Sequence, residues 1–175
     1  MRKILILLAP LALASCEAFD WGPREPQGGP TFPLVNAAGQ SIGTVRMWES
    51  PGAVTFRIEA AGLPMGIHGV HVHAVGRCDP PGFTTAGPHW NPTNRQHGLE
   101  NPAGPHAGDM PNVTVPASGV LGQTVTLPGA SFASLIDPDG SALILHADRD
   151  DLRTDPSGNS GARIACAVVS AASRL

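Results

Sequence analysis

The chain has 175 residues, which is enough for a single domain with its own hydrophobic core. It contains 21 glycines and 18 prolines but no tyrosine, a composition that favours short strands joined by turns over packed helices. Its net charge of -3 is too weak, and of the wrong sign, for a nucleic-acid-binding protein.

The N-terminal sequence MRKILILLAPLALASC is typical of an export signal rather than of the fold that follows. Arg2 and Lys3 precede an apolar run that is too short to span a bilayer stably. The ending LASC resembles a bacterial lipobox, in which the cysteine is lipidated and becomes the first mature residue. We therefore expect residues 1–15 to be a lipoprotein signal peptide and Cys16 to carry the lipid. An ordinary signal peptide cleaved nearby is the alternative.

Residues 16–30 are expected to form the lipidated cysteine and a flexible tether. The segment is rich in proline and glycine and has no hydrophobic periodicity. The residue that follows Cys16 is Glu17 rather than an aspartate. This choice resembles the sorting signal that directs lipoproteins to the outer membrane. The prediction is a bacterial cell-envelope protein, anchored to the membrane through Cys16 on the periplasmic side of the outer membrane.

From residue 31 the sequence alternates between short apolar runs and turns. Val54, Phe56 and Ile58 alternate with polar residues, the period-two pattern of a strand with one buried face. Other strand-like runs are TFPLVNAAG, SIGTVRMWES, NVTVPASGVLGQTVTLPG, SFASLI, SALILHA and ARIACAVVSA. No window of a dozen residues keeps a helical period. This pattern predicts an antiparallel sandwich or barrel.

The run GVHVHAVGRC places two histidines in an apolar strand. His71 and His73 project from one face of such a strand, whereas Val70 and Val72 project from the other. Two imidazoles on one face can supply two nitrogen ligands to a metal. The alternative is that each ring is only hydrogen-bonded or solvated. His68 has the opposite parity and is expected to point away from the pair.

Residues 77–111 form a long segment with seven prolines and no strand periodicity, which is uncommon unless the loop is functional or disordered. Histidine and aspartate at these spacings suit zinc, and a site rich in imidazole without thiolates also suits Cu(II). The candidate ligands in the segment are His89, His97, His106 and Asp109. Spacing alone leaves the number of metals open. A second long loop, residues 148–162, follows the strand that carries His146.

Cys78 and Cys166 remain once Cys16 is assigned to a lipid, and an even pair in an exported protein predicts one disulfide. A thiolate metal site is the alternative, although no C-x-x-C spacing supports it.

Five segments, in order, closely resemble the copper/zinc superoxide dismutases: GIHGVHVHAVGRC, TTAGPHWNPTNRQHG, HAGDMPNVT, LILHADRDDL and GNSGARIACAVV. The resemblance covers roughly residues 32–170. It implies an all-β fold in residues 31–175, an antiparallel Greek-key β-barrel or sandwich with long metal-binding and electrostatic-type loops.

The resemblance also implies a role for each candidate residue. The implied copper ligands are His71, His73, His89 and His146, and the implied zinc ligands are His89, His97, His106 and Asp109. Asp150 would hydrogen-bond His71 and His97 from behind, and Arg163 would hold the substrate anion beside the copper. Cys78 and Cys166 match the family disulfide.

The implied activity is superoxide dismutation, with copper cycling between Cu(II) and Cu(I) beside a structural zinc and with His89 and Arg163 as catalytic residues. The alternative is a non-catalytic copper- and zinc-binding envelope lipoprotein. The family pattern leaves a homodimer as one option. Ala147 and Asp148 stand where eukaryotic members carry a Glu-Lys pair that guides the anion, so Arg149 and Arg153 are either substitutes for that pair or ordinary surface residues.

Overall fold

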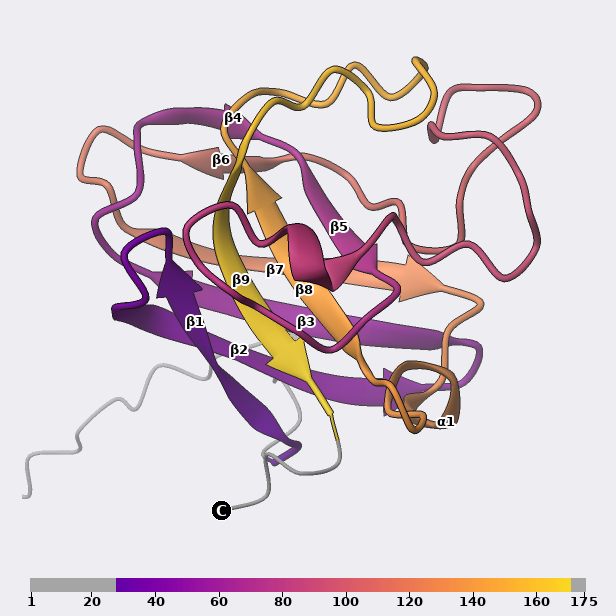
Figure 1. Cartoon of the computed structure of the whole chain (residues 1–175), viewed down its shortest axis with the longest axis horizontal. Helices are drawn as coiled ribbons and strands as arrows, with labels where there is room; N and C mark the ends of the chain where they lie inside the picture. Colours follow the sequence, from indigo (N-terminus) through magenta and orange to yellow (C-terminus); the bar gives the residue numbers. More distant parts are fainter. Residues whose placement is uncertain (1–27, 171–175) are drawn as a thin grey trace, which may run out of the picture.

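The computed structural model describes residues 28–170, which form a curled antiparallel sheet with two long loops at one end (Figure 1). The strands are β1 (Thr31–Asn36), β2 (Ser41–Ser50), β3 (Ala53–Ala60), β4 (Gly66–His68), β5 (Val70–His73), β6 (Val113–Val115), β7 (Leu121–Pro128), β8 (Ser141–His146) and β9 (Arg163–Val169). Two short helices are η1 (Thr84–Ala86) and α1 (Phe132–Leu135). The predicted signal peptide, the predicted lipidation site Cys16 and most of the predicted tether lie outside the described residues.

The larger sheet has the order β5-β8-β9-β1-β2-β3-β7, and β4 pairs with β6 in a second, two-stranded sheet. Every pair is antiparallel. Because β3 pairs with β7 and β5 pairs with β8, the chain crosses between non-consecutive strands, as a Greek key requires. The predicted all-β architecture is confirmed.

The hydrophobic core lies inside the curl of the sheet. Val54, Phe56 and Ile58 are fully buried there, so the period-two pattern read from β3 is confirmed. Val70 and Val72 of β5 join the same core, which fixes the register of that strand. The opposite face of β5 is also buried, and it carries two histidines.

The run SFASLI is not a strand as predicted but contains the single helical turn α1. The Ser131 hydroxyl accepts a hydrogen bond from the Ser134 backbone N–H, and the Ser134 hydroxyl accepts one from the Ser131 backbone N–H. This reciprocal capping satisfies the exposed donors of the first turn and outweighs the strand-like composition. Leu135 is buried in the core and the partly buried Phe132 packs against it, so the apolar residues of the turn still face the core.

The two long loops are held against the sheet and against each other. The 77–111 loop is hydrogen-bonded to β5, because the Val72 N–H donates to the Gly108 carbonyl and the Trp90 N–H donates to the Val72 carbonyl. The Glu100 N–H donates to the Leu152 carbonyl of the 148–162 loop at 2.9 Å. Among residues 28–170, no helix is long and apolar enough to cross a membrane.

Candidate metal centre

Four histidines from three parts of the chain meet above the face of β5 opposite the core. His71 and His73 lie on β5, His146 ends β8, and His89 lies in the 77–111 loop. One ring nitrogen from each of the four lies within 4.8 Å of the others, and all four side chains are buried. An isolated bridge between His73 and His89 fixes the loop at this point. The structure therefore brings together the four residues that the resemblance implied as copper ligands.

Each of these four rings has one nitrogen with no hydrogen-bond partner among residues 28–170. Those nitrogens are His71 Nδ1, His73 Nε2, His89 Nε2 and His146 Nε2, and all are buried. Buried polar atoms in native proteins are almost always satisfied, so four such nitrogens in one cluster require an explanation. A metal ion held by the four lone pairs would satisfy all of them. An all-imidazole donor set is also what Cu(II) prefers.

The second nitrogens of these rings are positioned by the fold. His73 Nδ1 lies 2.9 Å from the Gly87 carbonyl, and His146 Nδ1 lies 3.3 Å from the Gly161 carbonyl. A ring that donates from one nitrogen presents the lone pair of the other, which selects the tautomer able to bind a metal. Burial also lowers the pKa of His73 to about 2 and of His146 to about 3, so both rings are neutral at neutral pH.

A second donor set lies on the far side of His89. The Asp109 Oδ1 atom lies 3.0 Å from His89 Nδ1, 3.0 Å from His97 Nδ1 and 3.4 Å from His106 Nδ1. His106 Nδ1 and His89 Nδ1 are 3.3 Å apart. Ligands about 2.0 Å from a tetrahedral zinc are separated by about 3.3 Å, so these separations of 3.0 to 3.4 Å fit the ligands of one zinc ion.

His71 also lies close to this second set, because its ring stacks on that of His89 with centroids 4.1 Å apart. The outward Nε2 of His71 faces a carboxylate, however, and the other nitrogen belongs to the first donor set. His106 Nδ1 lies within 3.4 Å of Asp109 Oδ1 and of His89 Nδ1. His106 therefore completes the second set better than His71 does.

Asp150 joins the two sets from behind. One carboxylate oxygen lies 2.7 Å from His71 Nε2, and the other lies 3.0 Å from His97 Nε2. Burial acts to raise the pKa of Asp150, but the hydrogen bonds from His71 and His97 hold it below its ordinary value. The charged carboxylate thus orients one ring of each donor set, as the resemblance implied.

Two neighbours of Asp150 were not identified from the sequence. Asn112 clamps its backbone, since the Asn112 amide donates to the Asp150 carbonyl at 2.9 Å and accepts the Asp150 N–H at 2.9 Å. Gly158 has φ of 63°, and a Cβ there would lie 1.7 Å from Asp150 Oδ1. Only a glycine at this position leaves room for the bridging carboxylate.

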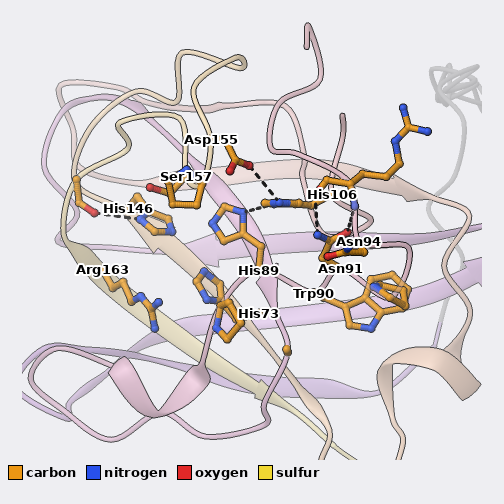
Figure 2. A pocket seen from close by; sticks show the side chains of 16 residues that line it. His73, His89, Trp90, Asn91, Asn94, His106, His146, Asp155, Ser157 and Arg163 are labelled. Carbon is orange, nitrogen blue, oxygen red and sulfur yellow. Dashed lines mark hydrogen bonds and ion pairs between the residues drawn. The ribbon is translucent and has the colours of Figure 1, made fainter. Parts of the chain in front are cut away.

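A cavity of about 780 Å³ opens onto the two donor sets, and Figure 2 shows His73, His89, His146 and Arg163 around it. The Arg163 guanidinium donates to the Phe83 carbonyl at 2.7 Å and to the Gly87 carbonyl at 2.8 Å. The Gly87 carbonyl also faces His73, so one oxygen positions both the cation and an imidazole. The side chain is half-buried, which strengthens its attraction for a small anion in the cavity.

The cations around the cavity differ from the two considered in the sequence. Arg149 and Arg153 do not line the cavity, and Arg153 pairs with Glu100 on the surface. Arg95, which the sequence analysis did not single out, does line it and donates to the Gly104 carbonyl. His68 lies apart from both donor sets, as its parity predicted, with ring nitrogens 2.9 Å from the His146 carbonyl and 3.0 Å from the Pro64 carbonyl.

The disulfide between Cys78 and Cys166 spans 88 residues and ties the start of the 77–111 loop to β9. Cys166 lies in a small buried cluster with Phe83 and Ala86. The same strand begins with Arg163, and the Phe83 carbonyl is one of the acceptors of its guanidinium. The bond therefore anchors the segment that positions Arg163.

Comparison with known proteins agrees with this geometry. Residues 41–169 match the family model described as copper/zinc superoxide dismutase (SODC). A relative named superoxide dismutase [Cu-Zn] 1 from Aquifex aeolicus (strain VF5) is 43% identical over 142 residues, covering 78% of this chain and 84% of the relative. The superoxide dismutase-like protein YojM from Bacillus subtilis (strain 168) is 35% identical, covering 97% of this chain and 96% of the relative.

Solved structures show the same relationship. The crystal structure of a SOD-like protein from Bacillus subtilis superposes with a TM-score of 0.78 at 38% identity, covering 81% of this chain and 98% of that one. The Cu/Zn superoxide dismutase from Brucella abortus gives a TM-score of 0.68 at 31% identity, covering 79% of this chain and 97% of that one. The sequence match, the fold and the paired donor sets lead to one conclusion: this chain belongs to the copper/zinc superoxide dismutase family.

Proposed function

We propose that the chain is an enzyme that converts two superoxide anions and two protons into dioxygen and hydrogen peroxide. The observation that supports this most strongly is a cluster of four buried histidine nitrogens beside the half-buried Arg163. These nitrogens have no hydrogen-bond partner in the part of the chain that the structure describes. The cluster provides the donors for a redox metal, and the arginine provides a positive charge for a small anion.

The proposed copper ligands are His71, His73, His89 and His146, and the proposed zinc ligands are His89, His97, His106 and Asp109. Copper, when bound, supplies the Cu(II)/Cu(I) couple, and zinc supplies a charge without redox chemistry. His89 is common to both sets and is the residue that holds or releases a proton at Nε2. Arg163 binds and orients the anion, and Asp150 keeps His71 and His97 in the tautomers that present Nδ1.

The test is the rate of superoxide decay with the purified chain loaded with copper and zinc, beside an Arg163→Ala variant. The proposal predicts fast decay that needs copper and falls several-fold in the variant. A chain that holds both metals but leaves the spontaneous rate unchanged would refute it. That outcome would instead favour the non-catalytic metal-binding lipoprotein.

We also propose that the protein is a lipoprotein of the bacterial envelope, with residues 1–15 as the signal peptide, Cys16 as the lipidated residue and residues 31–175 as the dismutase-like domain. The Cys78–Cys166 disulfide supports an oxidising compartment such as the periplasm. Labelling with a radioactive fatty acid should mark the wild-type chain but not a Cys16→Ala variant. Analytical ultracentrifugation of the purified chain would decide whether it forms a homodimer.

A further inference from the structure

Each of the three histidines in the proposed zinc set has a second ring nitrogen that points away from the zinc position, and two of these nitrogens face the groups already described. His89 Nε2 faces the proposed copper set, and His97 Nε2 lies 3.0 Å from the Asp150 carboxylate. The remaining nitrogen, His106 Nε2, faces the Asp155 carboxylate at 3.6 Å, as Figure 2 shows.

Asp155 belongs to the 148–162 loop but contacts the other long loop. Its Oδ1 atom accepts the backbone N–H of His97 at 2.6 Å, and the same atom is the one that faces His106. One carboxylate oxygen therefore lies between two residues of the zinc set. The side chain is 48% exposed and forms part of the cavity wall.

We propose that Asp155 is a positioning residue for the zinc site, acting as the acceptor for the outer N–H of His106; this inference rests on the zinc assignment in the proposed function. A neutral imidazole that donates from Nε2 must present its lone pair at Nδ1, which is the atom that faces Asp109 and His89. A shift of about half an ångström would bring the 3.6 Å contact to an ordinary hydrogen-bond length.

His106 needs this support more than the other donors do. It is the most exposed of the four, at 8% against 6% for His89, 3% for Asp109 and 0% for His97. Packing alone therefore constrains its ring the least. Asp155 compensates from a second loop, so the contact between the 148–162 loop and the 77–111 loop also supports the zinc set.

The first readout is zinc affinity, measured on the full chain by competition with a chromophoric chelator. Asp155→Ala should weaken zinc binding about 10- to 100-fold, the usual effect of removing such a partner. Asp155→Asn keeps one acceptor oxygen and should lose less. Asp151→Asn is the matched control, because it removes the same charge from the same loop. Asp151 accepts from the backbone N–H groups of Arg153 and Thr154, from the Thr154 hydroxyl and from the Asn159 amide. It faces no histidine in the described part of the chain, so the control should bind zinc as the wild type does.

The second readout is the Nε2–H proton of His106 in the NMR spectrum of the zinc-loaded chain, which a merely structural role for Asp155 would leave unchanged. The signal should be protected from solvent exchange in the wild type and in Asp155→Asn, and lost in Asp155→Ala. Wild-type zinc affinity and a protected proton in Asp155→Ala would overturn the proposal, as would equal weakening in Asp151→Asn. A wild-type chain that binds no zinc would instead refute the proposed function, and this inference with it.

Discussion

Removing the Asn112 side chain should destabilise the metal-free protein far more than its position directly before the short strand β6 suggests. Its amide makes two hydrogen bonds with the backbone of Asp150, which is fully buried. Asn112→Ala would leave a buried N–H and a buried carbonyl without partners. Each such group costs about 1 to 3 kcal/mol, so the two together should lower the free energy of unfolding by about 2 to 6 kcal/mol.

The measurement is chemical and thermal unfolding of the metal-free chain with its disulfide intact. For a domain of this size, each kcal/mol corresponds to about 2 to 4 °C in Tm, so the shift should be readily detected. Asn91 offers a matched control, because it makes the same pair of hydrogen bonds with the backbone of Arg95, at 2.8 and 3.0 Å. That pair is exposed, and water can replace the amide, so Asn91→Ala should cost less than about 1 kcal/mol.

Equal losses in the two asparagine variants would refute the reasoning, because burial of the partner backbone would then make no difference. An Asn112→Ala variant with wild-type stability would show that water reaches Asp150 despite its burial.

Three further predictions concern the cavity, the metals and the disulfide. Arg95→Ala should lower the rate constant for superoxide decay and weaken the dependence of that rate constant on ionic strength, because Arg95 lines the cavity. Arg153→Ala alters a surface ion pair and should leave both quantities unchanged. Equal effects of the two variants would contradict the guiding role of Arg95. Chelation of both metals should lower Tm, and titration with zinc should restore it in a concentration-dependent way, since a ligand that binds only the folded state stabilises it. Cys78→Ser should lower the free energy of unfolding by about 4 kcal/mol, because the disulfide closes a loop of 88 residues. Denaturant titration measures this loss, and a loss below about 1 kcal/mol would contradict the prediction.

Alternation of apolar and polar residues within a strand was enough to predict which side chains face the core. The alternation at Val54, Phe56 and Ile58 identified a strand with a core face, and the parity of His71 and His73 placed both rings on the face opposite the core. The same approach was wrong for SFASLI, since a run of six apolar and small residues carries too little periodicity to separate a strand from a capped helical turn.

Features that depend on contacts between distant loops could not be predicted in this way. Asn112 contacts Asp150 across 38 residues, and Asp155 contacts His97 across 58 residues. Nothing in the local sequence of either residue indicates its partner. The candidate guiding arginines show the same limit. Arg149 and Arg153 were considered because of their position in the chain, whereas the fold places Arg95 on the cavity wall.

The central claim is that two metal sites share His89, and electron paramagnetic resonance of bound Cu(II) tests it most directly. One sample carries Cu(II) with Zn(II), and the other carries Cu(II) with paramagnetic Co(II) in place of zinc. If His89 links the two sites, the Cu(II) signal should be normal beside zinc and strongly altered beside cobalt. An identical Cu(II) signal in both samples, with both metals shown to be bound, would contradict a shared ligand.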